Sequence, residues 1–139
     1  MRVSIVAKSQ LSEKQLRYLT DRISAPEHAL DTGPRTVWHN ESYGPNYYAI
    51  VLTETQTPIG TLYASGPDTH IDAAWWIDSR YRGEGYGSEA IDEFAALLKG
   101  KGVTGIGRIL IDTYQGRYHD ASSKLCARLK AHFALQPAR

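Results

Sequence analysis

The spacing of apolar residues changes several times along this chain, and each change marks a boundary between elements. Stretches that are β-branched and aromatic, or that alternate between apolar and polar, predict strands over residues 3–6, 47–53, 59–64, 71–77 and 106–111. The second and third strands flank the turn TETQTP and form a hairpin. In the fourth strand, the period of two places Asp72, Ala74 and Trp76 on one face of the sheet.

Apolar residues three and four positions apart predict three helices. In the first, Ser12 and Gln15 form a capping box at the start, and Pro26 ends the helix. The second follows a glycine-rich loop, and the third takes Asp120 or Ser122 as its N-cap. The apolar stripes of these helices comprise Leu16, Leu19 and Ile23; Ile91, Phe94, Ala95 and Leu98; and Leu125, Leu129 and Phe133.

The elements follow the order β-α-(α)-β-β-β-α-β-α, in which the bracketed helix is a short turn within the irregular residues 27–46. This mixture predicts an α/β protein with one sheet layered by helices, formed by residues 1–139 as a single domain. Few residues follow Phe133. We therefore expect either a short final strand or an exposed sheet edge that a second copy of the chain covers, as a homodimer.

Composition and charge limit the partners, the cellular compartment and the kinds of site that we expect for this protein. The 139 residues carry a net charge of +1, without the basic excess that is typical of proteins binding nucleic acid or anionic membranes. The single cysteine, Cys126, cannot form an intramolecular disulfide, and no apolar run is long enough to span a membrane, so we expect a cytoplasmic protein. The histidines are too scattered along the chain to predict a metal site.

The segment RGEGYG, residues 82–87, lies between a predicted strand and a predicted helix. The first N–H groups of a helix have no intrahelical partner, and glycines let an anion approach them closely, so this arrangement is typical of an anion site. Arg82 adds a charged donor. The dinucleotide pattern GxGxxG is not met because Ser88 stands at its last position, and the loop has no lysine for a nucleotide-hydrolase phosphate loop. The alternative is a tight turn whose glycines only relieve backbone constraints.

The same segment resembles the (Gln/Arg)-x-x-Gly-x-(Gly/Ala) signature of the GCN5-related N-acetyltransferases, and its context AAWWIDSRYRGEGYGSEAIDEF resembles their central strand, pyrophosphate loop and following helix. The later stretch DASSKLCARL is similar to the family's Asn-x-x-Ser/Ala helix opening, with Asp120 in place of Asn. The resemblance implies a mixed, mainly antiparallel, twisted sheet flanked by helices, and a site for acetyl-coenzyme A without a metal. The cofactor-binding residues that it implies are Ile77, Asp78, Arg82, Gly83, Gly85, Tyr86, Gly87, Ser88 and Asp120.

The resemblance also implies a reaction, in which the acetyl group moves to a primary amine of a small molecule or protein by direct attack in a ternary complex. A base must then take a proton from the amine. Asp72 is the first candidate because family members often carry a glutamate at this place on the strand. A carboxylate there can equally face solvent or pair with an arginine. Glu54 at the end of the preceding hairpin strand is the second candidate, and His70 is the third.

The proton donor for the departing thiolate is where the chain departs from the family. Many members carry a tyrosine seven residues beyond the Asn position, which is Ala127 here. Cys126, Tyr118, Tyr114 or a water can take the role, although Cys126 can also be a small buried helix residue and the tyrosines can be packing or surface groups. The missing tyrosine leaves open a second function, a catalytically impaired coenzyme A-binding module with a regulatory or interaction role.

The acceptor is expected to bind at the irregular residues 27–46, because binding residues concentrate on loops held by a rigid sheet. Aromatic residues in and beside this segment can form an apolar or cation-binding wall for an amine, or simply cover the sheet. They are Trp38, Tyr43, Tyr47 and Tyr48.

Overall fold

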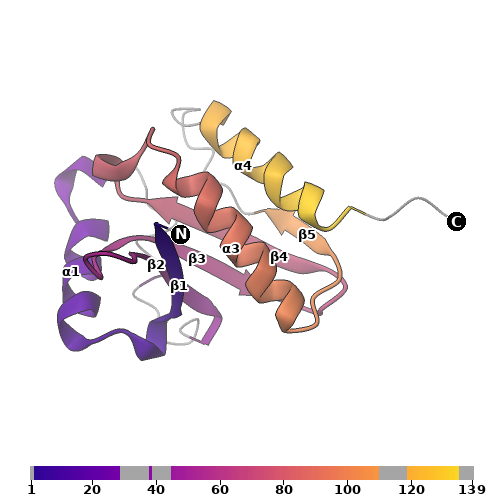
Figure 1. The fold of residues 1–139 in the computed structure, drawn as a ribbon, viewed down its shortest axis with the longest axis horizontal. Helices are drawn as coiled ribbons and strands as arrows, with labels where there is room; N and C mark the ends of the chain where they lie inside the picture. The colour runs from indigo at the N-terminus through magenta and orange to yellow at the C-terminus, as the bar shows by residue number, and fades with distance from the viewer. Residues whose placement is uncertain (1, 29–37, 39–44, 110–118, 135–139) are drawn as a thin grey trace, which may run out of the picture.

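A computed structural model describes residues 2–28, 38, 45–109 and 119–134, which form a twisted sheet with helices on both faces (Figure 1). The strands are β1 (Val3–Ala7), β2 (Tyr47–Leu52), β3 (Pro58–Ser65), β4 (Ile71–Ile77) and β5 (Ile106–Ile109). The α-helices are α1 (Glu13–Ile23), α3 (Tyr86–Gly100) and α4 (His119–His132), and the short 3-10 turns are η1 (Lys8–Gln10), η2 (Pro26–His28) and η4 (Ser79–Tyr81).

The strands of the sheet lie in chain order, β1-β2-β3-β4-β5. Neighbours from β1 to β4 pair antiparallel, whereas β5 pairs parallel to β4 because α3 carries the chain across the sheet between them. The predicted mixed, mainly antiparallel α/β sheet is therefore confirmed.

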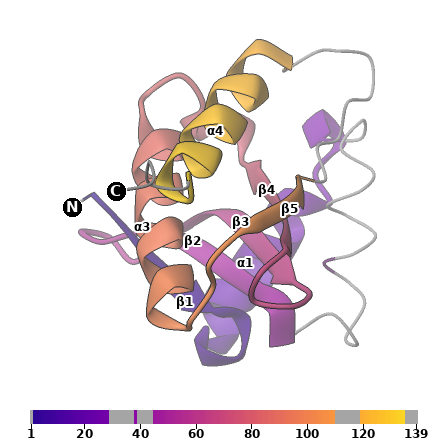
Figure 2. The same ribbon diagram turned by 90° about the vertical axis from the view of Figure 1, so that its right-hand side faces the viewer.

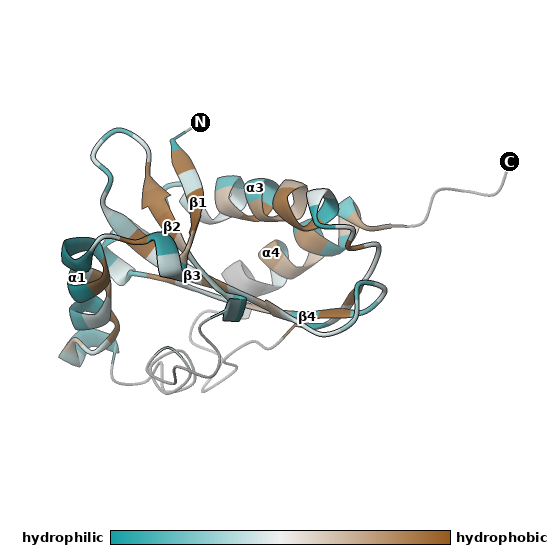
Figure 3. Ribbon diagram, turned by 90° about the horizontal axis from the view of Figure 1, so that it is seen from below, coloured by the Kyte–Doolittle hydropathy of each residue, from teal (hydrophilic) through white to brown (hydrophobic). Residues whose placement is uncertain are grey.

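Each face of the sheet carries its own apolar cluster. One cluster packs β4 residues such as Ala73 against Ile91 and Phe94 of α3, with Leu129 of α4. The other packs Trp76 of β4 beneath α1. Figure 3 shows α3 and α4 together on one side of the sheet, and Figure 2 shows α4 beside α3. The alternation predicted for β4 is thus confirmed, since odd-numbered residues face α3 and even-numbered ones face α1.

The N-cap predictions for α1 and α4 have different outcomes. At α1 the hydroxyl of Ser12 accepts the N–H of Gln15 (3.0 Å), and the Gln15 side chain accepts the N–H of Ser12 (3.0 Å), so the capping box is confirmed. The prediction that Asp120 or Ser122 caps the last helix is wrong, because α4 spans His119–His132 and contains both residues.

Candidate functional site

The glycine loop lies between η4 and α3 and turns through left-handed backbone conformations. Gly83 has a φ of 82° and Gly85 a φ of 85°, a region that residues with a Cβ rarely adopt. Gly85 is the N-cap of α3, and the N–H groups of the first helical residues, Tyr86, Gly87 and Ser88, have no acceptor within the helix. Together with the helix dipole, these donors make the loop a place where an anion is stabilised.

Arg82 connects this loop to the end of β4. Its Nε donates a hydrogen bond of 2.7 Å to the main-chain oxygen of Ile77, and its side chain is half-buried. The guanidinium therefore lies where the strand ends and the loop begins, close to where an anion on the loop would sit.

The edge of β4 that faces β5 supplies further main-chain groups. Asp78 donates its N–H to Ile59 on the β3 side (2.8 Å), whereas Ile71 donates to Gly105 on the β5 side (3.0 Å). Since N–H and C=O groups alternate between the two neighbours of a strand, those of Trp75 and Ile77 point to the β5 side. Within the described residues, the pairing of β5 with β4 ends at Ala73, opposite Ile109. Trp75 and Ile77 lie on this edge of β4, beyond the last described pair.

Asp78, which the family resemblance places beside the cofactor, has its side chain directed elsewhere. The carboxylate is fully buried and accepts hydrogen bonds from Nε and Nη2 of Arg22 in α1 (2.7 and 3.0 Å) and from the main chain and side chain of Arg80. Burial alone would raise the pKa of Asp78, but these donors outweigh it and lower the pKa to about 2. The side chain of Asp78 therefore anchors the loop to α1.

His28 completes this buried anchor. Its Nε2 accepts the N–H of Ser79 (3.1 Å), so the proton of a neutral ring is on Nδ1, which lies 2.6 Å from the main-chain oxygen of Arg22. The ring also packs edge-on against Trp76, with centroids 4.9 Å apart. The anchor of Arg22, His28 and Asp78 thus joins the end of α1 to the turn that precedes the glycine loop.

Gly87 and Ser88, both expected at the pyrophosphate, lie in the first turn of α3. A Cβ at Gly87 would lie 3.2 Å from Cδ1 of Leu125, so this glycine permits the close packing of α3 against α4. Asp120 lies at the start of α4, on the helix that packs beside α3, but its side chain is outside the described part of the structure. Tyr114, Tyr118 and Tyr43 also lie outside the described residues.

Two of the three candidate bases lie together where β5 begins. Asp72 accepts the main-chain N–H of Arg108 (2.9 Å) and pairs with its guanidinium (3.2 Å), and these hydrogen bonds lower the pKa of Asp72. A Cβ at Gly107 would come within 2.9 Å of both the Asp72 carboxylate and the His70 ring, so the two side chains converge over this glycine. The arginine pairing foreseen for Asp72 is present, and Asp72 directly precedes Ala73, the last β4 residue in the described pairing with β5.

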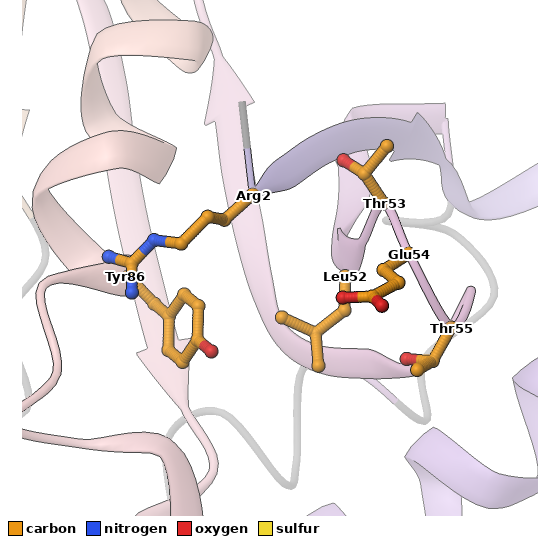
Figure 4. Close-up of a pocket in the computed structure, with 6 residues that line it drawn as sticks. All are labelled: Arg2, Leu52, Thr53, Glu54, Thr55 and Tyr86. Atoms are coloured by element: carbon orange, nitrogen blue, oxygen red, sulfur yellow. The ribbon is translucent and has the colours of Figure 1, made fainter.

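Glu54 lies apart from these groups, in the turn between β2 and β3. It lines an open pocket of about 320 Å³ with Arg2, Thr53, Thr55 and Tyr86, among others. Figure 4 shows the pocket between this turn and the start of α3. The pocket lies on the β1 and β2 side of α3, whereas Asp72 lies at the β5 side of the sheet. The structure does not bring Glu54 together with Asp72.

The aromatic residues proposed as an acceptor wall belong mostly to the core. Trp38 and Tyr47 are buried in the cluster beneath α1, and Tyr48 faces the opposite side of the sheet, where its hydroxyl accepts from Lys101 (2.7 Å). Covering the sheet is thus the role that the structure gives these three. Cys126 is half-buried in α4, and burial raises the pKa of its thiol, so the thiol stays protonated at neutral pH.

Arg2 is a residue at the loop that the sequence does not single out. Its Nη2 donates to the main-chain oxygen of Glu84 (2.9 Å), and its guanidinium also pairs with Glu89. An isolated arginine before a short strand has no motif, and the loop it contacts is 82 positions away in the chain. Only the tertiary structure could identify it.

Residues 2–28, 38, 45–109 and 119–134 contain neither a group of metal ligands nor a membrane-spanning helix. No three His, Cys, Asp or Glu side chains in them are grouped to hold a metal ion. Every helix within them falls short of the length and hydrophobicity needed to cross a bilayer.

Solved acetyltransferase structures resemble the fold at low sequence identity. The ribosomal-protein-S5-alanine acetyltransferase of Vibrio fischeri aligns with a TM-score of 0.58 and 16% identity over 93% of this chain and 79% of that one. An acetyltransferase of Agrobacterium tumefaciens gives 0.55 and 15% over 92% and 78%, and Tetrahymena GCN5 gives 0.55 and 14% over 76% and 68%. Curated protein sequences give no match.

The sequence itself carries the decisive match. Residues 6–131 match the family model described as the acetyltransferase (GNAT) domain, a span that includes β4, the glycine loop, α3 and most of α4. The loop geometry and the mixed sheet agree with that match, and the chain belongs to the GNAT family of acetyltransferases.

Proposed function

We propose that this protein transfers the acetyl group of acetyl-coenzyme A to a primary amine, by direct attack in a ternary complex. GNAT acetyltransferases use acetyl-coenzyme A as co-substrate. The observation that carries the proposal for this chain is the loop with left-handed Gly83 and Gly85 at the N-terminus of α3, directly after β4. The cofactor diphosphate binds at the N–H groups of this loop, with Arg82 as a charged neighbour.

The remaining length of the cofactor runs along β4. The N–H groups of Trp75 and Ile77 and the C=O of Trp75 point to the β5 side, where an extended chain containing amides can pair with them as a strand does, whereas the C=O of Ile77 accepts Nε of Arg82. A main-chain N–H on this edge also polarises the thioester carbonyl, because a rigid amide stabilises the oxyanion that develops there. No metal is needed for this stabilisation.

The reaction then proceeds through a tetrahedral intermediate. The amine nitrogen forms a bond to the carbonyl carbon, one of its protons passes to a base, and the C–S bond breaks to release the thiolate of coenzyme A. We assign the base role to Asp72, whose carboxylate is ionised at neutral pH as that of an ordinary aspartate is. The Arg108 side chain is 77% exposed, so an amine can displace it. The thiolate takes its proton from Cys126, Tyr118 or water.

Replacing Asp72 by asparagine tests this assignment without removing the main-chain contact, because the amide oxygen can still accept the N–H of Arg108. We expect kcat to fall roughly tenfold or more, with the dissociation constant of coenzyme A unchanged. Since the pKa of Asp72 is lowered, kcat/KM of the unaltered protein should show no acidic limb from this group above about pH 4. Full activity of the asparagine variant would assign Asp72 to holding β5.

The overall function is tested by calorimetry with coenzyme A and by measuring its release from acetyl-coenzyme A across a panel of amines. The panel contains small diamines, lysine peptides and peptides with a free N-terminus. We expect a micromolar dissociation constant, which corresponds to a binding free energy on the order of −8 kcal/mol, and amine-dependent release of coenzyme A. Binding without release on any amine would instead support the second function, a coenzyme A-binding module that has lost catalysis, for which Ala127 in place of the family tyrosine is the motivating feature.

A further inference from the structure

Arg2, directly before β1, makes its side-chain contacts with the glycine loop and the start of α3. Its Nη2 donates 2.9 Å to the main-chain oxygen of Glu84, and its Nε and main-chain N–H donate to the carboxylate of Glu89. Its guanidinium carbon lies 4.3 Å from the ring centroid of Tyr86. Figure 4 shows the side chain reaching from β1 across to Tyr86. One side chain thus holds three points on the segment proposed to bind the cofactor diphosphate.

The contact with Glu84 fixes the orientation of the loop. The Glu84 oxygen belongs to the peptide that joins Glu84 to Gly85, so a donor on this oxygen fixes the plane in which the N–H of Gly85 lies. A Cβ at Gly85 would be 3.1 Å from Nη2 of Arg2, which shows how closely the guanidinium approaches. Glycine has few backbone constraints because it lacks a Cβ. The contact from Arg2 therefore restricts the conformations open to Gly85, which has a φ of 85°.

The contact with Glu89 has an electrostatic consequence. Glu89 lies in the first turn of α3, where its negative charge would repel an anion at the helix N-terminus. The guanidinium of Arg2 forms an ion pair with this carboxylate and offsets its charge. The ion pair therefore reduces the repulsion between the Glu89 carboxylate and an anion bound at the helix N-terminus.

We propose that Arg2 is a positioning residue for the cofactor loop, which orients the Glu84–Gly85 peptide and neutralises Glu89 so that the diphosphate of coenzyme A can bind. This inference rests on the proposed function. A purely structural role is the weaker explanation, because the Arg2 side chain is 51% exposed and the main-chain oxygen of Arg2 is held independently by the N–H of Thr53 (2.9 Å). Removing the side chain leaves β1 paired with β2.

The test compares Arg2→Ala with Arg128→Ala. Arg128 is also a half-exposed arginine that pairs through two nitrogens with a carboxylate of α3, Asp92, but it joins α3 to α4 and does not contact the loop. Calorimetry with coenzyme A should show a dissociation constant roughly five- to tenfold higher for Arg2→Ala and within twofold of the unaltered protein for Arg128→Ala. In steady-state kinetics, the KM for acetyl-coenzyme A should rise for Arg2→Ala while kcat stays unchanged.

Two further variants separate the two parts of the role. Arg2→Lys keeps the charge but cannot reach Glu84 and Glu89 with a rigid fork, so it should recover only part of the affinity. Adding Glu89→Gln to Arg2→Ala should remove the repulsion and recover another part, most clearly at low salt. Equal affinity of Arg2→Ala and the unaltered protein, or an equal loss for Arg128→Ala, would overturn the inference. Failure of the unaltered protein to bind coenzyme A would overturn the proposed function instead.

Discussion

Replacing Asp78 by alanine is expected to lower the free energy of unfolding by about 3 kcal/mol, because it leaves buried charge without its partner. The Asp78 carboxylate is fully buried, and Arg22, whose side chain is 15% exposed, donates two hydrogen bonds to it. Alanine would leave the Arg22 guanidinium with the partly exposed Glu27 as its ion-pair partner among the described residues, and would remove the acceptor of the Arg80 N–H. Denaturant unfolding monitored by circular dichroism measures the loss.

The matched control for this variant is Asp92→Ala. Asp92 also accepts two hydrogen bonds from an arginine, Arg128, and its pKa is likewise lowered to about 2, by Arg128 first and then by His132. The Asp92 side chain is 31% exposed and that of Arg128 is 48% exposed, so water and salt screen this pair. We expect it to cost less than half as much as Asp78→Ala. Equal losses from the two variants would contradict the argument that burial decides the effect.

The same two carboxylates predict how stability depends on pH. The folded pKa of Asp78, about 2, lies below the reference value of 3.8, so its contribution is fully present above about pH 4 and is lost as the pH falls toward 2. Asp92 acts in the same direction and in the same range. Unfolding curves at pH 2 to 5 should therefore show a steep loss of stability, and this loss should be smaller in Asp78→Asn, which has no carboxylate to protonate at this position.

The elements of the fold could be predicted from local pattern, because each depends on residues close in sequence. The bounds of β4 and the side of the sheet that Trp76 faces follow from alternation, and the start of α1 follows from Ser12 and Gln15. The start of α4 could not be placed in this way. Asp120 and Ser122 have the side chains of N-caps, but the helix begins before them, because an N-cap preference of about 1 kcal/mol is small beside the packing of a helix against the core.

The residues of the candidate site also fall into two groups, those whose role follows from the local sequence and those whose role depends on distant parts of the chain. The loop conformation is local, since glycines at positions 83 and 85 permit the left-handed turns found there. The side-chain role of Asp78 is not local, because it depends on Arg22, 56 residues earlier, and on His28 beneath Trp76. The role of Arg2 depends on Glu84, 82 residues later. A motif locates the cofactor loop, but the contacts that hold the loop come from parts of the chain that the motif does not include.

Replacing Gly85 by valine is expected to weaken coenzyme A binding by roughly a hundredfold, the largest effect on function that the structure predicts. The φ of 85° is unfavourable for any residue with a Cβ and most for a β-branched one, and the added Cβ would lie 3.1 Å from Nη2 of Arg2. Relief of both strains moves the peptide planes at the start of α3, so the N–H groups of the loop no longer converge on one anion.

Gly102 provides the control, because it follows the other end of the same helix and has a similar φ of 94°. The variant Gly102→Val imposes the same kind of backbone strain, so both variants should lose comparable stability in thermal unfolding. Only Gly85→Val should lose affinity in calorimetry with coenzyme A. If Gly102→Val lost as much affinity, the effect would come from general destabilisation of α3, and if Gly85→Val kept its affinity, the diphosphate would bind somewhere other than the glycine loop.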